Sequence, residues 1–298
     1  MNYSKIVSSI DSSVNFIAKY GRSKIECRYV RRSDDYISAY LSSHNGCTMG
    51  CKFCWLTSTN QTNFKHVNDN LYGDQLNTIL QHAKSIDGDN SKNVKVNINF
   101  MARGEPLANK YIINYYPNLY NTLNCTTRFH NYKSIKMNIS TILPKTVQYK
   151  QLHDIFKDYP AYIYYSLYST NIDFRNKWMP NAIHWRVALD KLKLYQEYSN
   201  LPITIHFAII DDENDDINDV KTMASIIDDY QFDPLKFNIV RFNPHPTLLY
   251  KEAEPEKIDE IFDILSTVSN DISIEGNKTR IVPRIGKDVY ASCGMFIE

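Results

Sequence analysis

The stretch Cys47-Thr48-Met49-Gly50-Cys51-Lys52-Phe53-Cys54 carries three cysteines at C-x₃-C-x₂-C spacing, directly after an apolar-rich run over 36–43. Three thiolates this close can occupy three corners of one cubane iron–sulfur cluster, which leaves one of its four irons without a cysteine. Such an iron can hold a small molecule. A second interpretation is a closed zinc site, in which His44 or His66 completes a Cys₃His ligand set.

The composition is that of an ordinary globular protein. With 298 residues, of which 43% are hydrophobic and 22% charged, the chain can form a single α/β barrel-like domain, and disordered and membrane proteins are disfavoured. The formal net charge of +1 gives no global argument for nucleic-acid binding. Any RNA contact must therefore come from a local patch. Arg28, Arg31 and Arg32 are one candidate, or else simply a solvated face.

No segment looks like a targeting or membrane-spanning sequence. Residues 1–10 lack the apolar core of a signal peptide, and no later run reaches transmembrane length, so we expect a cytoplasmic monomer without membrane contact. Six cysteines in a chain of this size do not indicate a disulfide framework. Three of them crowded together in a reducing compartment indicate metal ligands.

The pattern of apolar residues predicts helices and strands in alternation. Residues 5–20 have apolar positions at helical spacing and predict a helix that ends at Gly21. A hairpin with strands over 25–31 and 36–43 follows. Beyond it we expect helices over 70–86, 110–123, 145–158, 184–199, 216–230 and 255–269, and strands over 94–101, 134–142, 161–168, 202–210, 235–241 and a final pair within 271–284.

Strands separated by helix-length segments predict right-handed βαβ units and a parallel sheet. Six such units give an α/β fold, a partial (β/α)₆ TIM-like barrel, preceded by a short N-terminal helix and β-hairpin. We therefore expect an N-terminal extension over 1–35 and a core over 36–298. In such barrels ligand groups gather at the carboxyl ends of the strands. Polar residues follow six successive strands there, namely the cysteine loop, Gly104-Glu105-Pro106, Ser140-Thr141, Ser166-Leu167-Tyr168, 211–215 and Asn243-Pro244.

Together these segments resemble the RlmN/Cfr family of radical S-adenosylmethionine (SAM) enzymes, which methylate an adenine carbon of ribosomal RNA and, in some members, of transfer RNA. The MxxGEPL run at 101–107 and the SCG element at 292–294 point to this family in particular. The matching segments follow the family's order, at 42–54, 97–109, 138–144, 164–169, 203–216, 237–244 and 291–296.

The resemblance implies a barrel of the radical SAM type that binds a [4Fe-4S] cluster on Cys47, Cys51 and Cys54, with SAM on the free iron. It also implies an electron donor such as flavodoxin or ferredoxin, and an RNA substrate, either rRNA or tRNA. Beyond the cysteines, the resemblance assigns SAM-binding roles to residues at the strand ends: Phe53, Gly104, Glu105, Ser140, Ser166, Tyr168 and Asn214.

These SAM-binding roles differ in kind. By the resemblance, the Gly104-Glu105 loop accepts from the SAM ammonium through the carboxylate or a backbone carbonyl, and the two serines meet the SAM carboxylate. Asn214 hydrogen-bonds the ribose, and Phe53 packs against the cluster or the adenine. Tyr168 stands in place of a family histidine and contacts SAM through its backbone. Taken alone, the Gly104-Glu105 loop would sooner be a tight turn with an exposed Glu, the serines ordinary strand ends, Asn214 part of a helix cap and Phe53 a core aromatic.

Cys293 is implied to be the methyl carrier and is our candidate catalytic residue. In the family, a cysteine in this setting takes a methyl group from one SAM, and a radical derived from a second SAM removes a hydrogen from it. The resulting carbon radical adds to the adenine. A thiolate suits the first step because it is nucleophilic near neutral pH when its pKa is lowered. Without the resemblance, a single cysteine near the end of the sequence would more often be a bystander.

The chain departs from the family at three places. Tyr40 stands seven residues before Cys47, where the family has a second cysteine that resolves the protein–RNA adduct; Cys27 is a possible substitute or a buried structural thiol, as is Cys125. Arg103 replaces an uncharged residue, and only 1–35 stand for the family's longer RNA-gripping domain. A divergent radical SAM enzyme acting on a small RNA or a nucleotide therefore remains the alternative, and a zinc-stabilised, non-catalytic RNA-binding module is the third interpretation.

Overall fold

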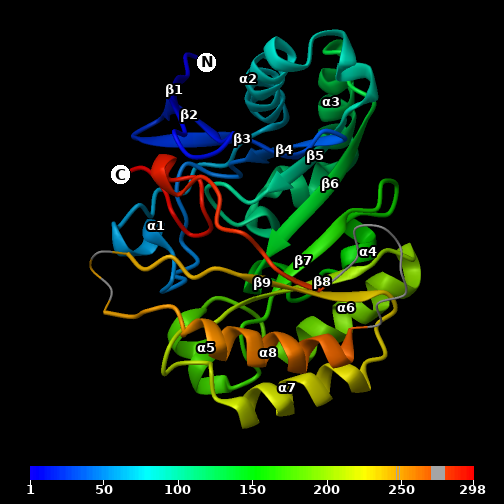
Figure 1. The fold of residues 1–298 in the computed structure, drawn as a ribbon. Coiled ribbons are helices and arrows are strands. Elements are labelled where there is room, and N and C mark those ends of the chain that lie inside the picture. The colour runs from blue at the N-terminus through cyan, green and yellow to red at the C-terminus, as the bar shows by residue number, and fades with distance from the viewer. Residues whose placement is uncertain (246, 248, 270–278) are drawn as a thin grey trace.

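The computed structural model describes residues 1–245, 247, 249–269 and 279–298. Ten strands form one curved sheet in chain order, antiparallel from β1 to β4 and parallel from β4 to β10 (Figure 1). The strands are β1 (Ser4–Val7), β2 (Val14–Tyr20), β3 (Ser23–Ser33), β4 (Tyr36–Leu41), β5 (Lys95–Phe100), β6 (Ser134–Thr141), β7 (Tyr162–Ser166), β8 (Ile203–Ala208), β9 (Leu235–Val240) and β10 (Arg280–Ile281).

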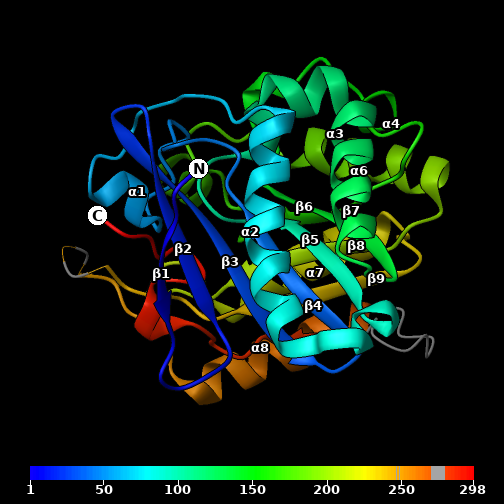
Figure 2. The same cartoon turned by 90° about the horizontal axis from the view of Figure 1, so that it is seen from above.

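The helices cover the outer, convex face of the sheet, where the apolar core lies (Figure 2). Every residue of β8 and β9 is buried, as expected of parallel strands enclosed on both faces. The helices are α2 (Asp69–Asp87), α3 (Lys110–Phe129), α6 (Trp185–Ser199), α7 (Ile217–Asp229) and α8 (Pro255–Val268), with the short α1 (Trp55–Ser58), α4 (Leu152–Ile155) and α5 (Ile172–Trp178).

The predicted helix over 5–20 is wrong, and with it the short N-terminal helix of the expected fold. The segment forms β1 and β2, an antiparallel pair with Ser4 opposite Ile17 and Val7 opposite Val14. Polar side chains make the turn between them: Ser8 Oγ accepts from the backbone N–H of Asp11 at 3.1 Å, and Asp11 Oδ1 accepts from that of Ser13 at 2.7 Å. These local bonds compete with helix formation.

The six predicted strands of the parallel sheet, β4 to β9, are confirmed. The predicted helix over 145–158 is reduced to a 3₁₀ turn at Lys145–Val147 and the single turn of α4. Of the final strand pair expected within 271–284, only β10 is described, because 271–278 lie outside the described residues. None of the described helices has the length and apolarity that a membrane span requires.

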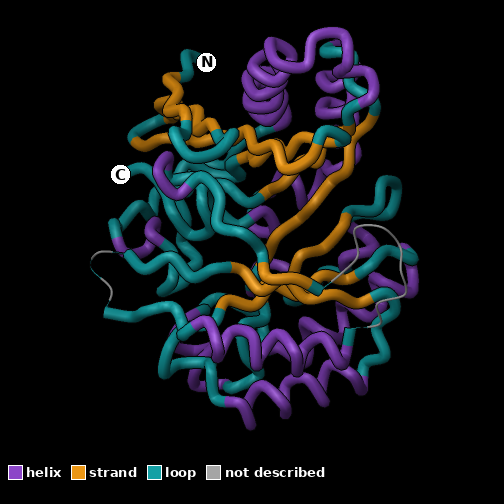
Figure 3. The backbone as a smooth tube through the Cα atoms, in the orientation of Figure 1, coloured by secondary structure: helices purple, strands orange, loops and turns teal. Residues whose placement is uncertain are grey.

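The parallel strands do not close into a full barrel, since β10 pairs with β9 and not with β1. Figure 1 shows the C-terminal segment, in red, crossing from β9 towards β3 over the open side of the sheet. Loops rather than helices gather on this side, as the teal tube of Figure 3 shows. The site described below lies behind this segment.

Candidate active site

A cavity of about 280 Å³ lies at the carboxyl ends of the parallel strands, and the predicted site residues meet there. Only Asn214 is not among its lining residues. The cavity brings together ten predicted positions from the cysteine loop, from the ends of β5, β6 and β7 and from the C-terminal tail: Cys47, Cys51, Phe53, Cys54, Gly104, Glu105, Ser140, Ser166, Tyr168 and Cys293.

The three cysteines of the motif lie in one loop that follows β4 and precedes α1. The backbone N–H of Cys54 donates to the carbonyl of Cys51 at 3.1 Å, which folds the loop back on itself. Burial raises the pKa of Cys47 to about 12 and that of Cys54 to about 11. Neighbouring thiols raise the pKa of Cys47 and Cys51 further. An iron cluster held by these thiols would reverse this balance, because metal coordination deprotonates a thiol outright.

The donor set fits a cluster held by three thiolates better than a Cys₃His zinc site. Both ring nitrogens of His44 already have protein partners: Nδ1 lies 3.0 Å from Ser43 Oγ, and Nε2 lies 3.0 Å from His66 Nδ1. His44 also stacks on Phe64. The two histidines considered as fourth ligands are thus engaged with each other.

Gly104 and Glu105 make a tight connection from β5 to the 3₁₀ turn Pro106–Ala108. Gly104 has φ +93°, and a Cβ there would lie 2.6 Å from His44 Nδ1 and Ser43 Oγ, so only glycine fits. Glu105 Oε1 accepts from Thr141 Oγ1 at 2.6 Å, and Oε2 accepts from the backbone N–H of Ile142 at 3.1 Å. The carboxylate therefore ties the end of β5 to the end of β6.

Burial raises the pKa of Glu105 to about 7, although its hydrogen bonds oppose the shift. Its side-chain oxygens are engaged in the protein, whereas the backbone of this loop still lines the cavity. A contact to an ammonium group is therefore easier through the loop's carbonyl groups than through the carboxylate.

Two aromatic rings lie side by side against the cysteines. Phe53 stacks on Tyr168 with ring centroids 4.8 Å apart and an interplanar angle of 4°. Burial raises the pKa of Tyr168 well above its usual value, and the nearby Cys293, Cys51 and Cys54 raise it further. Tyr168 thus lies close to both the motif cysteines and the tail cysteine.

Asn214 lies away from the cavity lining, with its amide fully engaged inside the protein. Its Oδ1 accepts from the backbone N–H of Ile210 at 2.8 Å, while Nδ2 donates to the carbonyls of Tyr168 at 2.8 Å and Ala208 at 2.9 Å. The ribose contact expected of Asn214 stays a prediction, and it requires at least one of these bonds to open.

Cys293 is accessible and faces the same cavity as the motif cysteines. Asn243, which was predicted to follow the sixth strand of the sheet, anchors the backbone of Cys293. Its Nδ2 donates to the carbonyl of Cys293 at 2.9 Å and to Ser292 Oγ at 3.0 Å. Surrounding protein raises the pKa of the Cys293 thiol, and the positive charge of Arg28 opposes that shift.

The tail is also bonded directly to the cysteine loop. The backbone N–H of Trp55, the residue after Cys54, donates to the carbonyl of Gly294 at 3.0 Å. Gly294 has φ +75° and lies against the carbonyl of Phe53, so the residue after Cys293 needs to be glycine. This explains physically why the sequence has a Cys-Gly pair here.

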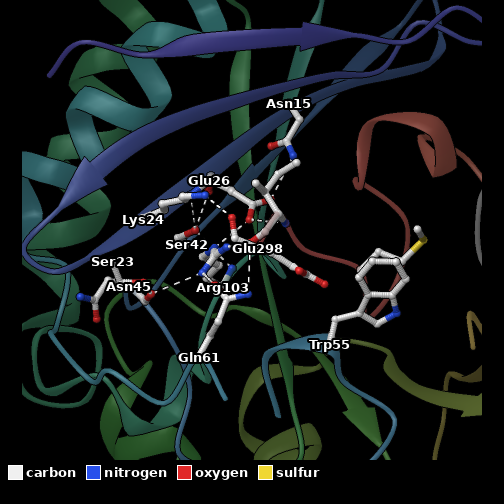
Figure 4. Close-up of polar contacts among 12 residues, drawn as sticks. Asn15, Ser23, Lys24, Glu26, Ser42, Asn45, Trp55, Gln61, Arg103 and Glu298 are labelled. Carbon is white, nitrogen blue, oxygen red and sulfur yellow. Dashed lines mark hydrogen bonds and ion pairs between the residues drawn. The ribbon is translucent and has the colours of Figure 1, made fainter. Parts of the chain in front are cut away.

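A buried ion network holds the last residues of the tail, and sequence reasoning did not find it. Figure 4 shows Glu26 of β3 at the centre, with Arg103 and Asn15 directed towards it. Glu26 Oε1 accepts from Arg103 Nε at 2.7 Å and from the backbone N–H of Ile297 at 3.0 Å, and Oε2 accepts from Arg28 Nη2 at 3.1 Å. The two arginines keep the pKa of Glu26 low despite its burial.

The same arginines bind the tail's carbonyl groups and its aromatic ring. Arg28 Nη2 donates to the carbonyl of Met295 at 2.8 Å, and Arg103 donates to that of Ile297. Both guanidinium groups lie over the ring of Phe296, at 4.9 and 5.8 Å from its centroid. Arg103, which departs from the family pattern, therefore helps to position the segment that bears Cys293. The charge difference was visible in the sequence, but its partner 77 residues away was not.

The two cysteines considered outside the motif lie elsewhere. Cys27 is fully buried in the core on the outer face of β3, near Asp74 of α2, while its neighbour Arg28 faces the cavity. Its register partner on β4 is Leu41. Cys125 is exposed on α3. Tyr40, by contrast, lines the cavity together with Cys293.

Comparison with known proteins gives one consistent answer. No protein-family model matches the chain. It is 26% identical over 294 residues to the dual-specificity RNA methyltransferase RlmN of Francisella tularensis subsp. tularensis, in both strain FSC 198 and strain SCHU S4, covering 96% of this chain and 73% of each relative. The fold is that of a radical SAM methyltransferase from Sphaerobacter thermophilus, with a TM-score of 0.77, 18% identity and coverage of 98% of this chain and 80% of that one. The resemblance to the RlmN-type radical SAM methyltransferases is therefore confirmed along nearly the whole chain.

Proposed function

We propose that this chain is a radical SAM enzyme that methylates an adenine carbon of RNA, with Cys293 as the methyl carrier. The joint placement of four cysteines carries the proposal. The three motif thiols and Cys293 line one cavity, and the tail is hydrogen-bonded to the residue after Cys54. The similarity to the RlmN methyltransferases supports RNA as the substrate.

Cys47, Cys51 and Cys54 would hold a [4Fe-4S] cluster, which together with bound SAM would supply a 5′-deoxyadenosyl radical on reduction. Ser140 and Ser166 present hydroxyl groups for the SAM carboxylate from the ends of β6 and β7. The backbone of the Gly104-Glu105 loop accepts from the ammonium. Phe53 and Tyr168 form a flat apolar wall beside the thiols.

Cys293 performs the first half of the reaction. Its thiolate attacks the methyl carbon of one SAM, so that a new S–C bond forms while the methyl–sulfonium bond breaks and S-adenosylhomocysteine leaves. Arg28 favours the thiolate form. The 5′-deoxyadenosyl radical from a second SAM would take one hydrogen atom from the S-methyl group, giving 5′-deoxyadenosine, and the resulting carbon radical would add to the adenine carbon. Loss of the ring proton and cleavage of the C–S bond would then leave the methyl group on the adenine after protonation, and one electron from the redox partner would return the Cys293 sulfur to the thiolate. Asn243 and Gly294 keep the sulfur in the cavity throughout.

We further propose that the protein is a cytoplasmic monomer that receives its electron from a small redox protein of the flavodoxin or ferredoxin type. The neutral overall charge supports a local rather than a global attraction for RNA.

Peptide mass spectrometry on Cys293 tests the proposal. Anaerobically prepared, cluster-loaded protein given SAM and a reductant should gain one methyl group on Cys293, and the methyl should pass to adenine when RNA is added. Cys293→Ala should still cleave SAM to 5′-deoxyadenosine but methylate no RNA, whereas the matched Cys125→Ala should behave as wild type. An unmodified Cys293 beside continuing SAM cleavage would contradict the carrier role.

A second candidate is a divergent radical SAM enzyme that uses the same radical on a small RNA or a nucleotide. Tyr40 favours it, because a phenol at the position of the family's second cysteine cannot form a disulfide with Cys293. Release of a crosslinked product is therefore the step at which this chain would differ from its relatives. Retention of Cys293 in the cavity favours the first proposal.

A further inference from the structure

The part of the cavity lining that β3, β10 and the segment after β10 supply is rich in arginine, and β4 and β7 add tyrosines. Period-two alternation places Arg28, Val30 and Arg32 of β3 on the lining, and Arg280, Val282 and Arg284 line it from β10 and the segment after it. These two runs of alternating arginine and valine belong to the opposite borders of the open side of the sheet. Among the lining residues that the structure describes, Glu105 is the only acid.

Two of these arginines differ from the rest in having no acidic partner. Glu26 pairs with Arg28, and Glu252 pairs with Arg284 at 3.1 Å and with Arg241. Within the described ranges, no carboxylate forms an ion pair with Arg32 or Arg280; they contact only neutral groups, Tyr40 Oη at 3.5 Å and Asn238 Oδ1 at 3.4 Å. The Nε of Arg32 is buried without a hydrogen-bond partner.

The interior of the sheet shows the same excess of positive charge. Burial lowers the pKa of His206 to about 3, and Lys236 and Arg280 lower it further. The pKa of Lys136 is lowered by burial, then by Lys95 and Arg280. Arg280 thus lies near the basic side chains of several neighbouring strands. A bound anion would offset this positive charge.

Tyrosines stand between the two unpaired arginines. Tyr36 and Tyr40 line the cavity from β4, and Tyr164 lines it from β7. The pKa of Tyr164 is raised by burial and also responds to Arg280, Tyr40 and Tyr36, which places these groups around its hydroxyl. Arginines interleaved with aromatic rings are the features by which proteins bind single-stranded nucleic acid, since phosphates meet the guanidinium groups and bases stack on the rings.

We propose that Arg32 and Arg280 bind a phosphodiester of a single-stranded RNA and that Tyr40 stacks on one of its bases. This inference rests on the proposed RNA substrate and names the residues that would hold it. It also gives Tyr40 a role of its own. Tyr40 stands where the resembled family has its second cysteine, and it would hold the substrate in place instead of resolving the protein–RNA adduct.

Fluorescence anisotropy of a short, fluorescein-labelled single-stranded RNA with one adenine tests the inference, using cluster-loaded full-length protein without SAM or reductant. Arg32→Gln and Arg280→Gln should each weaken binding about tenfold and lower the slope of log K against log salt by about 0.7. Tyr40→Ala should weaken it about tenfold, while Tyr40→Phe, which keeps the stacking ring, should bind like wild type.

Matched controls come from exposed residues outside the cavity. Arg128→Gln on α3 and Tyr149→Ala remove the same groups elsewhere and should leave binding unchanged. If all three cavity variants bound the RNA as tightly as the wild-type protein, this binding site would be wrong, but the proposed RNA methylation would stand. Wild-type protein that binds no RNA at low salt would count against the RNA substrate itself, and with it this inference. Displacement by inorganic pyrophosphate combined with no effect of Tyr40→Ala would show a simple anion site and overturn the assignment to RNA.

Discussion

Glu26 Oε1 and Arg103 Nε lie 2.7 Å apart, and neither side chain has any exposure to solvent. The pair joins β3 to the loop after β5, and both partners also bind the backbone of Ile297. A buried ion pair contributes little net stability, but breaking it leaves an uncompensated charge in the interior. Its main effect here is to fix the tail, and through the tail the position of Cys293.

Arg103→Met should therefore both destabilise the protein and release the tail. Because Glu26 would keep only Arg28 as a charged partner, we expect a loss of about 4 kcal/mol in the free energy of unfolding, measured with urea. Among folded molecules, maleimide should label Cys293 several-fold faster, since the tail loses the bond from Arg103 to the carbonyl of Ile297. The exposed Cys125 provides the internal reference, and equal acceleration at both thiols would indicate general loosening instead.

Glu105 should make stability depend on pH. Its folded pKa of about 7 lies above the ordinary value of 4.5, so its contribution to stability is fully present below about pH 4.5 and is lost as pH rises through about 7. The loss amounts to about 3 kcal/mol at most. Urea unfolding of the cluster-free protein at several pH values measures it. Glu105→Gln should lack this decline, and parallel pH profiles for the two proteins would contradict the assignment.

Asn214 should contribute more to the stability of the fold than to the affinity for SAM. Asn214→Asp replaces the amide that donates to the carbonyls of Tyr168 and Ala208 by a group that cannot donate, and we expect a loss of about 3 kcal/mol of stability. Isothermal titration of the folded variant with SAM separates the two roles. Unchanged SAM affinity would identify Asn214 as structural, and a large loss of affinity with little loss of stability would support the ribose contact.

Cys27 should be dispensable for chemistry. Because its side chain lies in the core on the face of β3 opposite to the cavity, Cys27→Ala should leave SAM cleavage and methylation of Cys293 unchanged. We expect only the cost of a small cavity, about 1 kcal/mol, in thermal unfolding. A variant that methylates Cys293 but fails to release product would show instead that Cys27 reaches the site.

The parallel part of the fold was predictable because strand and helix patterns alternate regularly from Tyr36 to Val268. Motif residues at the strand ends were predictable for the same reason, since parallel strands bring their carboxyl ends together. The first strands were missed because Ile6, Ile10, Val14 and Ile17 have helical spacing, while the turn between β1 and β2 depends on side-chain bonds of Ser8 and Asp11.

Contacts between distant segments were beyond the reach of local patterns. Nothing near Glu26 in the sequence indicates that it pairs with Arg103. Nothing near Asn214 indicates that its amide donates to the carbonyls of Tyr168 and Ala208. The Glu26–Arg103 ion pair and the hydrogen bonds of the Asn214 amide follow from tertiary packing, which residue spacing does not encode. The alternation of Arg28, Val30 and Arg32 is visible in the sequence. That it lines the same cavity as the similar run from Arg280 to Arg284 could be seen only in the structure.

The segment that covers the open side of the sheet has its own consequence for the substrate space. In the part of the chain that the structure describes, it pairs with β9 at Arg280 and Ile281, and hydrogen bonds to β3 and to the residue after Cys54 hold the rest. Insertions or exchanges in this wall can therefore remodel the space for substrate without disturbing the strands that carry the motif. The residues that would shape the substrate space are thus separable from the strands that carry the cysteine motif.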